Sequence, residues 1–288
     1  MSDYVQQNNS VCSFSGGDSW VILSPIEQSI KRKIEAVGTP LKDWDINIYR
    51  GVLTGCNEAF IISGAKKNEI LANCQTEDER MRTAELIRPI LRGRDIKRYK
   101  AEFADLWLIW IPWHFPLHQD KTIKGVSLKA EELFKIEYPS VYNYLLSYKP
   151  KLENRNKAET GIRYEWYALQ RWGAEYWEDF SKPKIFYADI SECLNFCLCT
   201  ETYMCNNTVY FMSTSEQSNL EYILTYLNSN IIDWYYKTLS VQLGERAVRL
   251  FSIYVMNIPI PKNGTTDIYK AFGLEDHEIK YIEAIYCN

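Results

Sequence analysis

Two segments of this 288-residue chain concentrate side chains that suit a polyanionic ligand. Residues 80–100 hold eight basic and two acidic residues around the glycine of RGRD, although the whole chain has a formal net charge of -4. Residues 149–171 hold six basic and three acidic residues, interleaved with Tyr164, Trp166 and Tyr167. Lysine and arginine bind phosphates, glycine lets a backbone approach them, and aromatic rings stack on bases. The pattern favours a nucleic acid.

Both segments also have an interpretation that involves no ligand. The run RMRTAELIR could be the solvated face of a helix with internal ion pairs, and YEWYALQRW could be the rim of a core element. The acidic net charge argues against a basic coat over the whole surface. It leaves room for a local basic cleft, because the field at a surface depends on where the charges lie.

The sequence lacks the common catalytic motifs. It contains no G-x-G-x-x-G or Walker loop for phosphates, no G-x-S-x-G nucleophile elbow and no H-E-x-x-H zinc motif. Glu178, Asp179 and Lys182 are spaced too loosely for the D…E-x-K arrangement of a metal-dependent nuclease. We therefore predict that this chain is not itself an enzyme.

Histidine and cysteine spacing also argues against a metal site. His114 and His118 are four residues apart, but Pro116 between them disfavours the helix that would place both on one face, so we expect solvated or partnered histidines. Cys193, Cys197, Cys199 and Cys205 do not have the paired C-x2-C spacing of a zinc knuckle. Cys197 and Cys199 are expected to pack on one face of a strand, and no metal is predicted.

Composition indicates a globular chain in a reducing compartment. Hydrophobic residues make up 46% of the sequence, and the first twenty residues have no apolar stretch typical of a signal peptide. The longest apolar run, LWLIWIPW, is too short to cross a membrane. Eight cysteines without a secretion signal indicate reduced thiols. We expect a cytoplasmic protein with no membrane partner.

Capping signals and hydrophobic periodicity predict the elements that position these residues. A proline and a capping box at Ser24 open a helix that Gly38 ends, and Thr76 opens another helix that Pro89 should end. Further helices are predicted at 128–137 and 139–153 and after Ser213, carrying Leu220, Ile223, Leu224, Leu227 and Ile231. Strands are predicted at 45–50, 58–63, 106–112, 184–190, 195–200 and 207–212, and YVMNIPIP is expected to close the core. Because strands and helices do not alternate regularly, we predict an α+β fold with a mixed, mainly antiparallel sheet core and flanking helices.

A series of blocks in a fixed order resembles a known family. The blocks are IYRGVLTGCNEAFII, LIRPILRGRDIKRY, YPSVYNYLLSYKPKLENR, KPKIFYADI, NNTVYFM, YILTYLNSNIIDWYY and VRLFSIYVMNIPIP. Together they resemble the C-terminal target-recognition domain of TaqI-like adenine DNA methyltransferases, as found in single-chain type IIG restriction-modification enzymes. The resemblance covers about residues 20–261, and several blocks in order are more specific than any one of them.

The resemblance implies DNA target recognition without catalysis in this chain. Family members carry an S-adenosylmethionine loop and an N-P-P-Y motif in an N-terminal catalytic domain, and neither motif occurs here. The chain is therefore expected to be the recognition domain of a site-specific adenine methyltransferase, with or without a fused type II endonuclease. Its expected partners are double-stranded DNA and that methyltransferase domain. S-adenosylmethionine is expected only in the methyltransferase domain, and no cofactor in this chain.

The resemblance and the charge pattern together assign residues to roles. The side chains predicted to hold phosphates are Arg92, Arg94, Lys97, Arg98 and Lys100. The candidates for reading base edges, on an irregular DNA-facing segment from 154 to 172, are Arg155, Asn156, Arg163, Gln170 and Arg171. The residues matching structural motifs of the family are Gly51, Thr54, Gly55, Asn57, Gly93, Asp95 and Asp189. Asp95 is expected to orient either Arg92 or Arg94 through a carboxylate–arginine fork.

The chain is expected to divide into a linker or arm at 1–19, a DNA target-recognition domain at 20–262 and a tail at 263–288 with helical character. Two other functions remain open. The aromatic residues would also suit a module that binds single-stranded nucleic acid or RNA. Tryptophan and tyrosine would equally suit the anchors of a protein-interaction domain.

Overall fold

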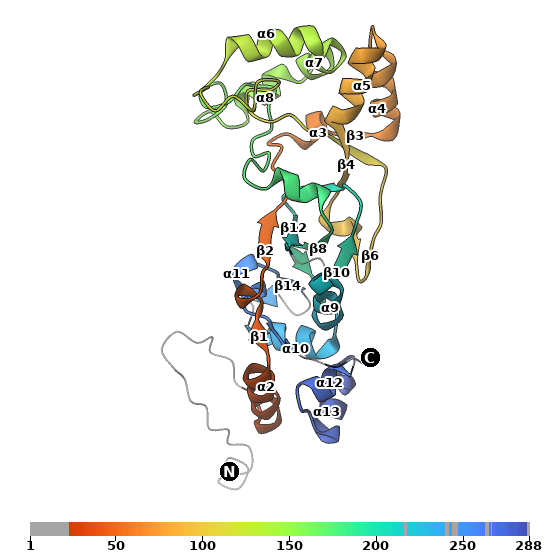
Figure 1. The fold of residues 1–288 in the computed structure, drawn as a ribbon, viewed down its shortest axis with the longest axis vertical. Coiled ribbons are helices and arrows are strands. Elements are labelled where there is room, and N and C mark those ends of the chain that lie inside the picture. The colour runs from red at the N-terminus through yellow and green to blue at the C-terminus, as the bar shows by residue number, and fades with distance from the viewer. Residues whose placement is uncertain are drawn as a thin grey trace. The chain divides into compact units, whose positions relative to one another are not determined.

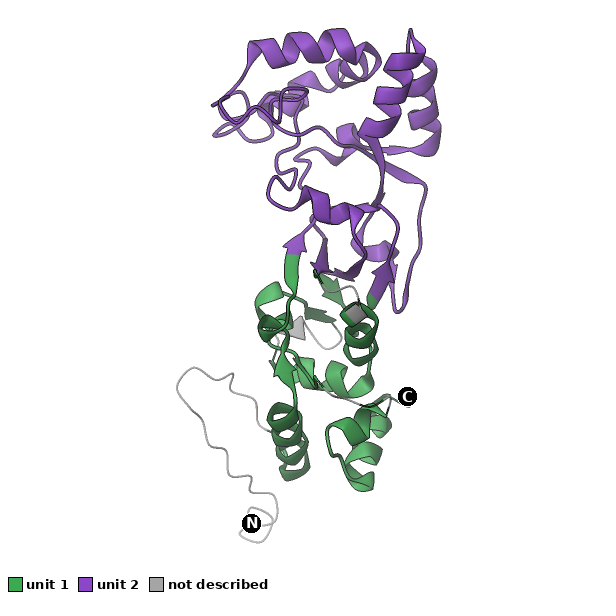
Figure 2. Cartoon of the chain, viewed as in Figure 1, with its two compact units in different colours: residues 1–48, 189–196, 214–288 green, residues 49–188, 197–213 purple. Residues whose placement is uncertain are grey.

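The computed structural model describes residues 23–215, 218–239, 242–243, 247–262, 265 and 267–286. The chain divides into two compact units (Figures 1 and 2). Unit 1 comprises residues 1–48, 189–196 and 214–288, and unit 2 comprises residues 49–188 and 197–213. The arm predicted at 1–19 lies outside the described residues, and the boundaries at 20–262 and 263–288 stay predictions.

Two four-stranded sheets contain most of the strands of unit 2. In the first, β8 (Lys184–Ala188) lies between β10 (Phe196–Cys199) and β12 (Val209–Ser213), and β2 (Asn47–Arg50) borders β12. In the second, the order is β11 (Met204–Cys205), β4 (Ile87–Leu91), β7 (Leu106–Ile109) and β3 (Ile61–Ser63). Of the pairs in this second sheet, β11 and β4 run parallel, and β4–β7 and β3–β7 run antiparallel.

Short helices and one hairpin complete unit 2 (Figure 1). The helices are α3 (Asn57–Phe60), α4 (Gly64–Ala72), α5 (Glu77–Leu86), α6 (Leu128–Glu137), α7 (Pro139–Leu146) and α8 (Lys149–Asn154), with 3-10 turns η2 (Gly93–Asp95) and η3 (Trp177–Ser181). The hairpin consists of β5 (Ile96–Lys97) and β6 (Lys100–Ala101). One continuous core of buried side chains joins these elements, including Phe60, Leu108, Phe134 and Phe211, each 0% exposed.

Unit 1 is mainly helical. Its helices are α2 (Pro25–Val37), α9 (Ser218–Leu227), α10 (Asn230–Leu239), α11 (Ser252–Val255), α12 (Ile268–Ala271) and α13 (Asp276–Tyr286), with a 3-10 turn η1 (Leu41–Asp43). Its strands are β1 (Thr39–Pro40) paired with β15 (Pro259–Ile260), and β9 (Ile190–Ser191) paired with β14 (Ala247–Arg249), which pairs with β13 (Gln242–Leu243). Glu278 of α13 is 1% exposed and accepts hydrogen bonds from Ser29 Oγ at 2.8 Å and Lys33 Nζ at 2.7 Å, so α13 is tied to α2.

Several predicted elements are confirmed. The capping box at Ser24 forms, because Ser24 N donates to Glu27 Oε2 at 2.7 Å, and the helix runs from Pro25 to Val37 as expected. The helix at 128–137 is present with those bounds, and Thr76 caps α5. Mixed, mainly antiparallel sheets with flanking helices confirm the α+β class.

Three elements differ from the prediction, each for a local reason. The strand expected at 58–63 begins as the helical turn α3, and only residues 61–63 are extended. The single helix expected at 139–153 is broken into α7 and α8, because Pro150 has no N–H to continue the helix and its ring crowds the preceding turn. Ile231 lies on α10 rather than on the helix of Leu227, and residues 216–217 at the predicted start of that helix fall outside the described residues.

Candidate nucleic-acid interface

The basic segment around RGRD forms a β-hairpin. Lys97 on β5 lies opposite Lys100 on β6, and Arg98 and Tyr99 form the two-residue turn between them. All four side chains are exposed. The hairpin therefore brings together three of the five residues predicted to hold phosphates. Two like charges directly opposite on paired strands repel each other, and a bound anion would relieve that repulsion.

A buried carboxylate holds the base of the hairpin. Asp95 is 5% exposed, and its carboxylate accepts hydrogen bonds from Arg92 N at 2.8 Å and from Arg92 Nε and Nη2 at 2.9 Å. Its carbonyl accepts from Glu102 N at 2.8 Å, on the other side of the hairpin. This fork selects Arg92 from the two partners expected for Asp95, and the hydrogen bond to Asp95 raises the pKa of Arg92. Arg92 thus serves the fold, whereas Arg94 is exposed beside the hairpin.

The cations of the hairpin have contacts within the protein and still keep exposed side chains. Lys100 Nζ lies 2.7 Å from Glu102 Oε1, but the lysine side chain is 67% exposed, and exposed ion pairs of this kind contribute little to stability. The Arg98 guanidinium carbon lies 5.6 Å from the centroid of the Tyr99 ring. Tyr99 was not among the site residues predicted from the sequence. A single aromatic residue among cations in a turn is the pattern that could have indicated it.

The aromatic rings expected to stack on bases are part of the core instead. Tyr164 and Tyr167 are 0% exposed, and Trp166 is 6% exposed. Trp113 stacks on Tyr164 with ring centroids 4.8 Å apart, and Phe134 packs on Tyr167 at 4.6 Å. The interpretation of this run as a stacking surface is therefore wrong. It is irregular in backbone, as predicted, but it fills the interior of unit 2.

Arg155 connects separate backbone segments of unit 2 through hydrogen bonds. Its guanidinium donates hydrogen bonds to the carbonyls of Thr54 at 2.6 Å, of Trp166 at 3.0 Å and of Ala168. Burial lowers the pKa of Arg155 to about 10. Because the guanidinium donates to three backbone carbonyls, it is poorly placed to read a base edge, and the geometry gives this residue a structural role.

The other four candidates for base reading lie in two places. Asn156 Nδ2 donates to Glu159 Oε2 at 2.8 Å, and Arg163 Nη1 donates to Glu159 Oε1 at 2.7 Å, so one carboxylate gathers these two residues. Gln170 lies beside Gly55, and Arg171 Nη2 donates to the carbonyl of Gly51 at 3.3 Å. Figure 1 draws β6 well apart from α8, after which the 154–172 segment begins. The start of this segment therefore lies away from the hairpin.

The residues matching the first family block shape a tight connection. Gly51 allows close approach of two strands, since a Cβ there would collide with the carbonyl oxygens of Cys205 and Asn206. Gly55 has a φ of +72°, which favours glycine, and Thr54 Oγ1 donates to Asn57 Oδ1 at 2.7 Å. These contacts are all internal to unit 2.

The two remaining family motifs also make contacts within their own units. Gly93 N donates to Thr208 Oγ1 at 3.0 Å, which ties the RGRD turn to the loop before β12. The carbonyl of Asp189 accepts from Leu250 N at 2.9 Å in unit 1. Both contacts tie the motif residue to a segment distant in sequence.

His114 and His118 have partners within the fold, and Cys197 and Cys199 are buried. His114 Nδ1 lies 3.0 Å from Oε1 of Glu165, a carboxylate 1% exposed, and His118 Nδ1 lies 3.2 Å from the carbonyl of Pro116. Cys197 and Cys199 are buried on β10, as predicted, and burial raises the pKa of the two thiols to about 12 and about 11. Within the described ranges, no three His, Cys, Asp or Glu side chains are placed to hold a metal ion.

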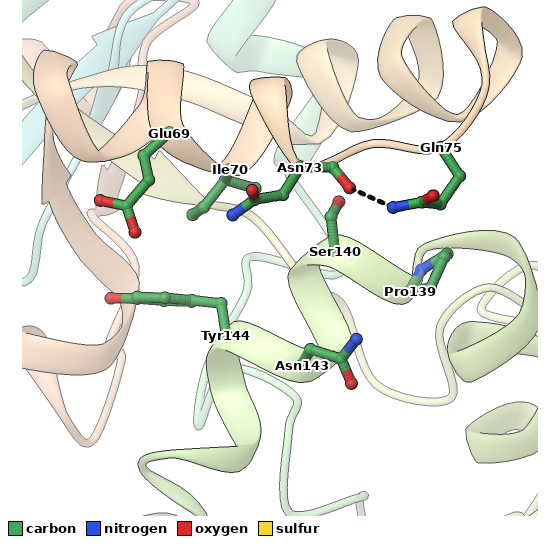
Figure 3. A pocket seen from close by; sticks show the side chains of 8 residues that line it. All are labelled: Glu69, Ile70, Asn73, Gln75, Pro139, Ser140, Asn143 and Tyr144. Carbon is green, nitrogen blue, oxygen red and sulfur yellow. Dashed lines mark hydrogen bonds between the residues drawn. The ribbon is translucent and has the colours of Figure 1, made fainter.

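A pocket of about 620 Å³ lies between the end of α4 and the start of α7 (Figure 3). Its lining residues are Glu69, Ile70, Asn73, Gln75, Pro139, Ser140, Asn143 and Tyr144. They include one carboxylate and no basic side chain, so this pocket does not suit a phosphate. Separately, no helix in the part of the chain that the structure describes has the length and apolar character needed to span a membrane.

The family model of the TaqI-like C-terminal specificity domain matches residues 88–260, more than half of the chain. The type II methyltransferase M.MjaIV of Methanocaldococcus jannaschii is 27% identical over 189 residues, which cover 65% of this chain and 55% of that protein. The chain thus spans about half the length of this relative.

Two solved structures of restriction-modification enzymes are similar. The type IIG restriction endonuclease BpuSI has a TM-score of 0.50 at 12% identity, over 92% of this chain and 28% of that chain. The type IIL restriction-modification enzyme MmeI, solved in complex with DNA, has a TM-score of 0.43 at 14% identity, over 76% of this chain and 25% of that chain. The first likeness concerns the fold alone.

Proposed function

The chain belongs to the family of TaqI-like C-terminal specificity domains, and on that premise we propose that it recognises a specific sequence in duplex DNA for a restriction-modification enzyme. The family supplies the class of function. The observation that supports the proposal for this chain is the β5–β6 hairpin. Its exposed cations lie beyond the two ends of the hairpin that buried Asp95 connects.

The hairpin has the chemistry that duplex DNA requires. A two-stranded ribbon is narrow enough to enter the major groove, and phosphates line both sides of that groove. Lys97, Arg98 and Lys100 would hold these phosphates, with exposed Arg94 beside them. Arg92 is left out because its guanidinium is bound to Asp95.

Base reading would fall to side chains that can turn outward. Arg163 is 58% exposed, pairs with Glu159 and has its guanidinium carbon 5.3 Å from the centroid of the Trp113 ring. An exposed ion pair of this kind costs little to exchange for a contact with a base. Arg171 is also exposed, and Asn156 and Gln170 are partly exposed, so these four remain candidates. Arg155 does not, because its guanidinium is bound to three backbone carbonyls of the fold.

Methyl transfer would belong to another domain. The sequence has neither the S-adenosylmethionine loop nor the N-P-P-Y motif, so S-adenosylmethionine, adenine methylation and any fused endonuclease would lie with a methyltransferase domain that works with this one in the cytoplasm. The relative M.MjaIV is a type II methyltransferase, which supports this pairing. Burial of Tyr164, Trp166 and Tyr167 removes the main support for binding single strands or RNA.

Salt-titrated binding tests the proposal. The chain is titrated with a labelled random-sequence duplex and with its separated strands, and the duplex is expected to bind more tightly. Lys97→Ala with Arg98→Ala should weaken binding to every duplex alike and flatten the slope of log affinity against log salt by about one unit per lost phosphate contact.

The matched control is Lys129→Ala with Lys135→Ala, which removes the same charge from exposed positions on α6. This control should leave affinity and salt slope unchanged. Equal binding of duplex and single strands, or equal losses in the two variants, would contradict the proposal.

A further inference from the structure

Tyr99 adopts a backbone conformation that disfavours its side chain. It is the second residue of the hairpin turn and has a φ of +67°. Glycine adopts such a φ without cost and asparagine adopts it readily, whereas for a bulky residue it is strained. Strain of this kind persists where the surrounding structure imposes it and is concentrated at functional sites.

The ring does not compensate for this strain by packing into the protein. The Tyr99 side chain is 54% exposed and does not belong to the buried core of unit 2. The contact described for it is with Arg98, whose guanidinium carbon lies 5.6 Å from the ring centroid, at the outer limit of a cation–π contact. An aromatic ring that costs backbone strain and gains little burial is suited to a ligand outside the chain.

The charges around the ring indicate the chemistry of that ligand. Lys97, Arg98 and Lys100 surround Tyr99 and are all exposed. The ligand must therefore offer anionic groups on both sides of a flat or apolar centre. Duplex DNA does so, with phosphates on each side of a groove whose floor carries base edges and thymine methyl groups.

We infer that Tyr99 is a base-contacting residue, which the hairpin inserts into a groove of duplex DNA while Lys97, Arg98 and Lys100 hold the flanking phosphates. The inference rests on the proposed function and adds the element that enters the groove and the side chain that reaches the bases. The anchored base of the hairpin supports it, because Asp95 holds Arg92 and Glu102 on either side and so keeps the tip in place.

Two substitutions at one position test this assignment. Tyr99→Gly removes the ring and suits the positive φ, so the hairpin should fold at least as well as in the wild type. Tyr99→Phe keeps the ring and removes the hydroxyl. The DNA is a duplex enriched from a random pool by the wild-type chain, compared with the unselected pool, and thermal melts accompany each titration.

We expect Tyr99→Gly to lose roughly 5- to 100-fold in affinity for the selected duplex, with little loss on the random pool and an unchanged salt slope. Tyr99→Phe should lose less than Tyr99→Gly. Wild-type affinity of Tyr99→Gly for the selected duplex would overturn the inference, and so would a loss equal on both DNAs accompanied by a flatter salt slope.

The experiments distinguish a failure of the role of Tyr99 from a failure of the proposed function. If Tyr99→Gly binds as the wild type while Lys97→Ala with Arg98→Ala still weakens binding, the role of Tyr99 is wrong and duplex binding stands. If the wild-type chain prefers single strands or enriches no duplex, the proposed function is wrong, and the role of Tyr99 fails with it.

Discussion

Arg155 illustrates how one residue can move from a predicted contact with DNA to the interior of the fold. Its guanidinium ties Thr54 to Trp166 and Ala168, segments that are distant in sequence. Arg155→Met keeps the apolar stem and leaves these carbonyls without their donor. We expect it to lower the free energy of unfolding by about 3 kcal/mol in denaturant titrations, without changing the order of preference among duplexes.

The control for Arg155 is Arg163→Ala, which removes an arginine from the same segment. Arg163 is 58% exposed, so unfolding should change by no more than about 0.5 kcal/mol. If Arg155→Met unfolds as the wild type and loses selectivity instead, Arg155 reads DNA after all.

Glu79 should make stability depend on pH. The carboxylate is 3% exposed, and this burial, the strongest single influence on its pKa, acts to raise the pKa. Hydrogen bonds from Gln75 N at 2.7 Å and Ser140 N at 3.0 Å, with smaller contributions, outweigh burial. The pKa of Glu79 is therefore lowered below 4.5. Because the pKa of Glu79 is lower in the folded than in the unfolded chain, its ionised carboxylate stabilises the fold fully at pH values above the unfolded-state pKa of about 4.5. This stabilisation is lost as the pH falls through the folded-state pKa.

Glu79→Gln is therefore expected to lower the free energy of unfolding at pH 7 by about 1–3 kcal/mol, and the difference from the wild type should shrink at pH values below about 4.5. Glu77→Gln, an exposed position on the same helix, is the control and should unfold as the wild type at every pH. A difference that stays constant across the acid range would contradict the assignment.

At the scale of elements, the hairpin depends on the fork at its base. Asp95→Asn keeps the shape of the side chain but removes the charge that pairs with Arg92. We expect unfolding to become easier by about 1–3 kcal/mol and duplex affinity to fall, because the cations lose their fixed positions. Arg94→Ala should lower affinity without changing the melting temperature. The reverse pattern in thermal melts would mean that Arg94 supports the hairpin.

Elements with local signals could be predicted from the sequence. The capping box at Ser24 and the apolar stripe of Ile30 and Ile34, both 0% exposed, specify α2 from one end to the other. The helix at 128–137 was equally well marked. Pro150 also indicates the break between α7 and α8, although a single helix was predicted there. The turn at 57–60 was not recognisable, because its buried Ala59 and Phe60 also fit a strand pattern.

The site could be predicted only in part. The charge of residues 94–100 was visible, but their pairing as a hairpin was not, since β5 and β6 have two residues each and no periodicity can be read from so short a strand. The aromatic residues at 164–167 were misassigned for a related reason. Composition does not tell an aromatic ring that stacks on a base from one that fills a core, and here Trp113 and Phe134 cover the rings.

At the scale of the whole molecule, the family match does not follow the boundary between the two compact units. The family match at 88–260 includes residues of both units, so the specificity domain is not confined to the unit that carries the hairpin. The chain covers 55% of the relative M.MjaIV. Under the proposed function, this chain would contribute the choice of sequence and another domain the methyl transfer.

The most direct test of the central claim is enrichment from a random-sequence duplex pool by the purified chain, followed by salt-matched titration of the enriched and unselected duplexes. We predict that one short sequence is enriched and binds at least about 100-fold more tightly than the unselected pool, with each mismatched base pair costing about 1–3 kcal/mol. A pool that stays random after repeated rounds, or a selected duplex displaced equally well by its own single strands, would contradict sequence-specific recognition of duplex DNA.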